Sequence, residues 1–277
     1  MLNKLIKHEF RATARLFLLA YAVVIGVALV NTALLGLKPS NGSGFAAAYS
    51  IFSGLMMFVY VMAILALLLM TIAFVIVRFY RMLGDEGYLW FTLPVTPTQQ
   101  ILGKLIPAAV WTIASIAVMF GSIGILLVHP LSRSVGQLSD AWRQMTTQGL
   151  NPSVWLIGML VFIVIALVMQ ILTFYSAMAV GPNLIKSSRL GGSVVAYIII
   201  YTATQILGIV GLGVMALLFG GAFEQLVNNG SVAGPDISVI NHAGVTFGGW
   251  FGAEYLVLGV VCFFITRYFI DRKLNLA

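Results

Sequence analysis

The sequence predicts an all-α, polytopic membrane protein. Of its 277 residues, 61% are hydrophobic and only 8% are charged, whereas about a quarter of the residues of soluble domains are charged. With 15 Lys and Arg and 8 Asp and Glu, the chain has too few charges to cover a water-exposed surface of this size. Its apolar residues also gather into charge-free runs long enough to cross a bilayer, which takes about 20 helical residues.

These runs predict six transmembrane helices in a single domain that covers residues 1–277. The spans lie at residues 16–37, 51–77, 106–128, 154–180, 194–219 and 247–269. The second span shows the pattern most clearly, because residues 55–77 hold no charge and consist mainly of Leu, Met, Ile, Val and Phe. Such a segment requires lipid as its surroundings.

The basic residues predict the orientation of the spans. If the six spans alternate in direction, only Lys38, Arg133 and Arg143 lie on one side, and the other Lys and Arg residues lie opposite. The second group consists of Lys4, Lys7, Arg11, Arg15, Arg78, Arg81, Lys104, Lys186, Arg189, Arg267, Arg272 and Lys273. Because positive residues collect on the cytoplasmic side, we expect a multi-pass protein of the cell membrane with both termini in the cytoplasm.

Residues 1–15 predict an amphipathic helix that lies in the membrane interface ahead of the first span. The apolar residues recur at helical spacing on one face and basic residues take the other: Leu2, Leu5, Ile6 and Phe10 against Lys4, Lys7, His8 and Arg11. The alternative is a basic terminus without fixed structure that serves only to set the topology.

The cytoplasmic segment 78–105, between the second and third spans, is too rich in signals for a plain turn. Asp85 and Glu86 place negative charge where a short helix would begin, and Pro94 would end that helix. Thr96 followed by Pro97 predicts the start of the next helix. Apolar side chains on such a segment must enter the headgroup layer or contact another protein. The segment carries Gly87, Tyr88, Leu89, Trp90, Phe91 and Leu93.

This segment, read as FYRMLGDEGYLWFTLPVTPTQQILGKL, carries a resemblance, together with the opening LIKHEFRATARLFLLAY and the six spans. The chain resembles the membrane-spanning permease subunits of bacterial type-2 ABC exporters. In that family the turn after the second span holds a coupling helix that docks on a separate ATP-binding subunit. The resemblance implies that Asp85–Pro94 has this role, that a second permease subunit completes the assembly, and that ATP and magnesium bind to the partner subunit.

Motifs for chemistry within this chain are missing from the sequence. It has no G-x-x-x-x-G-K-[ST] phosphate loop, since Gly103-Lys104 is followed by Leu105, and it has neither H-E-x-x-H nor G-x-S-x-G. A lone cysteine, Cys262, excludes a disulfide framework and a cysteine-based metal site. We therefore expect no enzymatic activity and no cofactor in this subunit. The basic residues form no stripe interleaved with aromatics, so lipid is an expected partner and nucleic acid is not.

Three polar residues within the spans are candidates for a pathway or gating role. Glu254 is the acidic residue that we place within lipid thickness, where a charge must face a cavity or a partner. Gln170 and Gln205 lie in the middle of the fourth and fifth spans, where amide side chains also serve as hydrogen bonds between helices. Two alternatives to the exporter stay open: an ion-coupled secondary transporter, and a membrane scaffold or sensor subunit that transports nothing.

Overall fold

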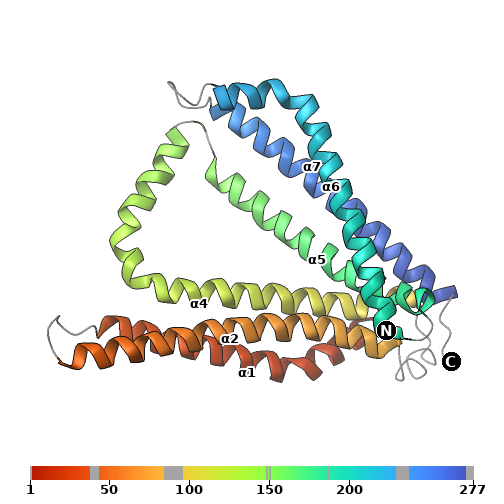
Figure 1. Ribbon diagram of the computed structural model, residues 1–277, viewed down its shortest axis with the longest axis horizontal. Helices are drawn as coiled ribbons and strands as arrows, with labels where there is room; N and C mark the ends of the chain where they lie inside the picture. The colour runs from red at the N-terminus through yellow and green to blue at the C-terminus, as the bar shows by residue number, and fades with distance from the viewer. Residues whose placement is uncertain are drawn as a thin grey trace. The chain divides into compact units, whose positions relative to one another are not determined.

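The computed structural model describes residues 2–37, 44–83, 96–147, 149, 151–185, 188–228 and 237–272. Within these ranges the chain is all-helical apart from short connections, as predicted (Figure 1). The helices, labelled as in Figure 1, are α1 (Leu2–Gly36), α2 (Gly44–Leu83), α4 (Pro97–Thr147), α5 (Pro152–Leu184), α6 (Arg189–Asn228) and α7 (Ile237–Arg272).

Six of the described helices contain a stretch long and apolar enough to cross a membrane, which confirms the number of predicted spans. The protein itself covers little of their surface. Only 11% of the residues in the most apolar part of α5 are buried, and Leu69 of α2 and Leu160 of α5 are more than 60% exposed. Helix surfaces that are both apolar and exposed are stable only in contact with lipid hydrocarbon, so the fold is that of a multi-pass membrane protein.

The chain divides into two compact units. The first consists of Met1–Arg78 and Gln99–Leu138, and the second of Phe79–Thr98 and Ser139–Ala277. In the first unit, α1, α2 and the first part of α4 lie side by side (Figure 1). In the second unit, α5 packs on both α6 and α7.

The core of the first unit follows one face of α1. The buried residues of this helix recur every three or four positions, and they are Glu9, Thr13, Phe17, Tyr21, Val24, Ala28 and Asn31. This is the spacing of a single helical stripe. In the middle of the stripe, Phe17 and Tyr21 pack with Tyr60 and Leu67 of α2 and with Trp111 of α4. Both ends of the stripe are polar.

Polar side chains along this core are paired across helices. The hydroxyl of Tyr21 donates to the Trp111 carbonyl oxygen at 3.1 Å and lies 3.0 Å from the Ser115 hydroxyl, which also accepts a hydrogen bond from Thr71. Near the other end, Asn31 donates to the carbonyl oxygen of Met56 on α2 at 3.1 Å. Such bonds hold helices together where apolar contact alone gives little preference over lipid.

In the second unit, almost all the buried residues of α5 lie in its C-terminal half. The rings of Phe79 and Tyr175 are stacked with centroids 3.8 Å apart. Cys262 of α7 is a free, buried cysteine. Gly181 of α5 and Ser193 of α6 approach so closely that a Cβ on Gly181 would lie 2.5 Å from the Ser193 Cα.

The helix boundaries differ from the sequence predictions at several points. Residues 2–36 form one continuous helix, so no break separates residues 2–15 from the first span. Pro182 lies inside α5, which continues to Leu184 although the predicted fourth span ends at residue 180. A proline in the last turn removes only one helical hydrogen bond, and the Ile185 N–H still donates to the Gly181 carbonyl oxygen at 3.3 Å. The start of α4 at Pro97 is as predicted.

Candidate functional site

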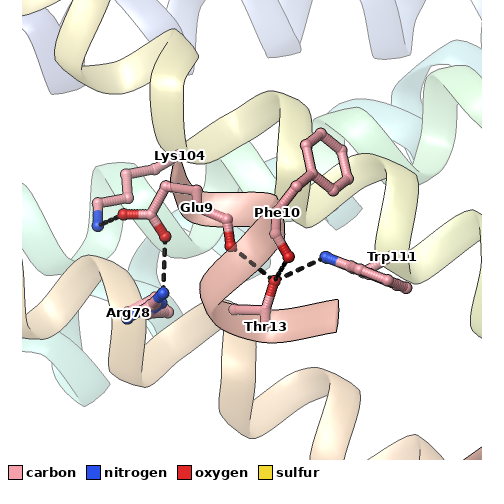
Figure 2. Close-up of polar contacts among 6 residues, drawn as sticks. All are labelled: Glu9, Phe10, Thr13, Arg78, Lys104 and Trp111. Atoms are coloured by element: carbon pink, nitrogen blue, oxygen red, sulfur yellow. Dashed lines mark hydrogen bonds and ion pairs between the residues drawn. The ribbon is translucent and has the colours of Figure 1, made fainter. Parts of the chain in front are cut away.

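A buried ion cluster joins three helices of the first unit (Figure 2). The Glu9 side chain of α1 is 5% exposed, and its Oε2 lies 2.9 Å from Arg78 Nη2 of α2. Its other oxygen, Oε1, pairs with Lys104 Nζ of α4, a side chain that is also 5% exposed. Arg78 is 31% exposed and its guanidinium lies 5.9 Å from the Phe74 ring centroid. One carboxylate thus holds two cations from different helices.

The next turn of α1 adds a neutral layer to this cluster. Thr13 donates its hydroxyl to the Glu9 carbonyl oxygen at 2.8 Å and accepts a hydrogen bond from the indole N–H of Trp111 at 2.9 Å (Figure 2). Glu9 and Thr13 are one helical turn apart and therefore lie on the same face of α1. The contacts of α1 with α4 are thus polar at both levels.

The ion cluster is costly to disturb. Removing one partner from a buried ion pair leaves an uncompensated charge and destabilises proteins by about 3 to 5 kcal/mol. Arg78 lies on the N-terminal side of the segment that contains Asp85–Pro94, and Lys104 lies on its C-terminal side. Glu9 therefore links α1 to the helix before this segment and to the helix after it.

The predicted coupling residues themselves, Asp85 to Leu93 and Pro94, lie outside the described residues. Arg78 and Lys104 were predicted only as cytoplasmic charges, and the role of Glu9 was missed. The sequence did contain a signal for this role. Glu9, Thr13 and Phe17 are spaced four residues apart and therefore share one helix face, whereas the basic residues next to Glu9 lie on the opposite face. That spacing places a carboxylate on the stripe that faces other helices.

A second site lies in the second unit, and it brings together all three polar residues predicted within the spans. Glu254 of α7, Gln170 of α5 and Gln205 of α6 line one cavity of about 390 Å³. Counting about 1.5 Å per helical residue, Glu254 lies roughly 15 Å along α7 from Gly244, inside the stretch Gly244–Asp271 that is long and apolar enough to cross a membrane.

The two glutamines have tyrosine partners. Gln170 donates to the Tyr197 hydroxyl at 3.2 Å, which joins α5 to α6, and Gln205 donates to the Tyr201 hydroxyl one turn away at 2.7 Å. The Gln170 bond joins two helices, which is one of the roles expected for an amide within the spans. The Gln205 bond lies within α6 and holds the amide against the cavity wall.

Glu254 differs from the glutamines. Its Oε2 is buried and has no hydrogen-bond partner among the described residues. Two glycines of α6 lie beside it: a Cβ on Gly208 would be in ordinary contact with Glu254 Oε1 at 3.7 Å, whereas a Cβ on Gly211 would lie 2.6 Å from Trp250 Nε1, which is too close. At Gly211 the helices α6 and α7 therefore approach closely, whereas Gly213 and Gly252 face open space.

Metal binding has no support in the part of the chain that the structure describes, where no three His, Cys, Asp or Glu side chains gather closely enough to hold an ion. Compared with known proteins, the chain matches no family model, no curated protein and no solved structure.

Proposed function

We propose that this chain is the membrane-spanning subunit of an ATP-driven ABC exporter, paired with a second permease subunit and with separate ATP-binding subunits. Its six apolar helices, the excess of basic residues on one side and the resemblance of residues 78–105 to a coupling segment all support this assignment. ATP and magnesium bind and react in the partner subunits, and this chain supplies the path through the membrane.

The observation that carries the proposal is the position of Glu9. It holds Arg78 and Lys104, one on each side of the segment with Asp85–Pro94. A force on that segment acts on the ends of α2 and α4, and the ion cluster ties both ends to α1. The three helices then respond as one body, which is what a coupling segment needs in order to change the path in the membrane.

In the proposed cycle, ATP binding draws two partner subunits together and each displaces the segment of one permease chain. Aromatic and apolar residues, here Tyr88 and Phe91, make the contact because burying them against the partner is favourable. The acidic residues Asp85 and Glu86 complete the contact through charge. Release of ADP and phosphate returns the segment to its starting position.

The test is association with an ATP-binding subunit. The tagged chain is purified from its native host, and proteins that copurify are identified by mass spectrometry, with ATPase activity measured on the complex. The expected partner has a phosphate-binding loop and is encoded beside this gene. Changing Tyr88→Asp together with Phe91→Asp should remove it.

The control is Trp142→Asp, which changes an exposed aromatic residue on the side predicted to be extracellular. It should leave the association intact. If the double variant folds and still retains the ATP-binding subunit, the coupling role of Asp85–Pro94 is wrong.

A second candidate function, an ion-coupled secondary transporter, is favoured by one observation: the buried Glu254 oxygen in the cavity. Intramembrane carboxylates often carry coupling ions. Transport by the purified chain in vesicles separates the two, since the exporter requires ATP and its partner subunit, and the secondary transporter requires only an ion gradient.

A further inference from the structure

We propose that the cavity around Glu254 binds a monovalent organic cation with an apolar body, such as a quaternary ammonium or phosphonium amphiphile. Binding of this cation does not depend on the exporter assignment. Only the step from bound cation to transported cargo rests on the proposed function.

Among the described residues that line the cavity, Glu254 is the only acidic residue, and none is Lys, Arg or His. A carboxylate in hydrocarbon without a partner is unfavourable. A cationic ligand beside Glu254 would supply the missing partner.

The polar lining selects an organic cation over a divalent metal ion. Calcium takes six to eight oxygen ligands, and magnesium requires near-octahedral coordination. This cavity offers one carboxylate, together with neutral amides and hydroxyls such as those of Gln170, Gln205 and Thr173. The aromatic rings of Tyr201, Phe251 and Tyr255 also line it, and aromatic faces attract ammonium-type cations. Its volume of about 390 Å³ is in the range of small-molecule sites.

An adjoining pocket has room for the apolar part of such a cation. Between α5 and α7 lies a second pocket of about 410 Å³, lined by apolar side chains such as Val168, Leu172 and Phe263. The two pockets share Met169 and Tyr255. A ligand with its charged group at Glu254 can therefore extend its apolar part along α5 and α7.

The apolar pocket is open on its outer side. Leu256, Val260 and Phe264 line it and are all more than half exposed. These residues belong to the apolar part of α7, so an amphiphile dissolved in the bilayer reaches the pocket without crossing water. The polar cavity and the apolar pocket together match a molecule with one cationic end.

The test is equilibrium binding of radiolabelled tetraphenylphosphonium to the full chain in phosphatidylcholine nanodiscs, without ATP and without any ATP-binding subunit. We expect saturable binding that Glu254→Gln weakens by about tenfold or more, as loss of a desolvated charge partner does. Tetraphenylborate, which has the same shape and the opposite charge, should not compete. Tetrapentylammonium should compete.

The matched control is Asp140→Asn, which removes an exposed carboxylate on α4 and should leave the affinity unchanged. Equal binding by folded Glu254→Gln, equal competition by tetraphenylborate, or an equal loss in Asp140→Asn would each overturn the proposal.

A measurement on the unmodified chain covers the case in which Glu254→Gln does not fold. A phosphonium analogue carrying a diazirine is photolysed on the protein, and the adducts are mapped by mass spectrometry. Adducts near Gln205 on α6 and Phe251 on α7, displaced by excess tetraphenylphosphonium, support the site. Adducts confined to other helices contradict it. Because ATP is absent throughout, failure here leaves the exporter proposal standing, and failure to find an ATP-binding subunit leaves this site standing.

Discussion

Phe17 of α1 lies flat against the indole of Trp111 of α4, with the ring planes 5° apart and the centroids 4.7 Å apart. Phe17 is fully buried, and Trp111 also donates its N–H to Thr13 one turn away. This contact therefore combines apolar packing with a directed hydrogen bond. It holds α1 on α4 directly beside the ion cluster of Glu9.

Removing the Phe17 ring should destabilise the first unit strongly. Phe17→Ala leaves a cavity against Trp111, and we expect a loss of about 3 to 5 kcal/mol, measured by reversible unfolding in mixed micelles. Trp111→Phe keeps a ring but leaves Thr13 without its donor, so the expected loss is smaller, about 1 kcal/mol. Phe120→Ala is the control, because Phe120 is 62% exposed. An equal loss in Phe120→Ala would show that ring size, not this contact, decides the stability.

The ion cluster should behave as a coupled unit. Glu9→Leu leaves Lys104 buried without its carboxylate and should cost about 3 to 5 kcal/mol. Lys104→Met in the same chain removes the unpaired charge and should recover part of the loss, since Arg78 is partly exposed and can reach water. The measurement is a double-mutant cycle on unfolding free energies, with the exposed Lys7→Gln as control. Additive losses in the cycle would contradict direct coupling of Glu9 with Lys104.

Gly181 should tolerate no side chain. A Cβ there would meet Ser193 Cα at 2.5 Å, and backbone atoms cannot move aside as a flexible side chain can. Gly181→Ala should push α5 and α6 apart and cost about 1 to 3 kcal/mol. Gly158→Ala in the same helix faces open space and should stabilise by about 0.5 to 1 kcal/mol, because alanine favours the helix. Thermal unfolding in detergent compares the two. A neutral Gly181→Ala would refute the close approach.

The orientation can be tested with single cysteines. Cys262 is the only cysteine of the chain and is buried, so Cys262→Ala gives a background without reactive thiols. In this background Trp142→Cys should react with a membrane-impermeant maleimide on intact cells. Lys7→Cys should react only after the cells are permeabilised, because positive residues collect in the cytoplasm. The reverse pattern would place residues 84–95 outside the cell and remove the exporter assignment.

The sequence was sufficient to predict the helices because a long apolar run without charges is itself the signature of a membrane-spanning helix. The second span needed no knowledge of its neighbours, and α2 contains it with additional turns at both ends. Helix ends were harder to predict. The fourth span was predicted to end at residue 180, but α5 continues through Pro182 to Leu184, because a proline in the last turn removes only one helical hydrogen bond.

The candidate sites depend on how helices rotate against one another, which hydropathy does not encode. Glu9 could be placed on a helix face from its spacing, but its partner Lys104 is 95 residues away. Glu254, Gln170 and Gln205 were each recognisable as polar residues in apolar runs. Their meeting around one cavity depends on the close packing of α6 and α7, for which Gly211 leaves space beside Trp250.

The Glu9 cluster also bears on how the protein is made. Ribosomes deliver α1 first, so Glu9 is made before either cation exists to neutralise it. Arg78 follows with the end of α2, and Lys104 arrives only when α4 begins to emerge. Assembly of the first unit therefore has to wait for α4, and a nascent chain stopped before Lys104 should be a preferred substrate for membrane chaperones and proteases.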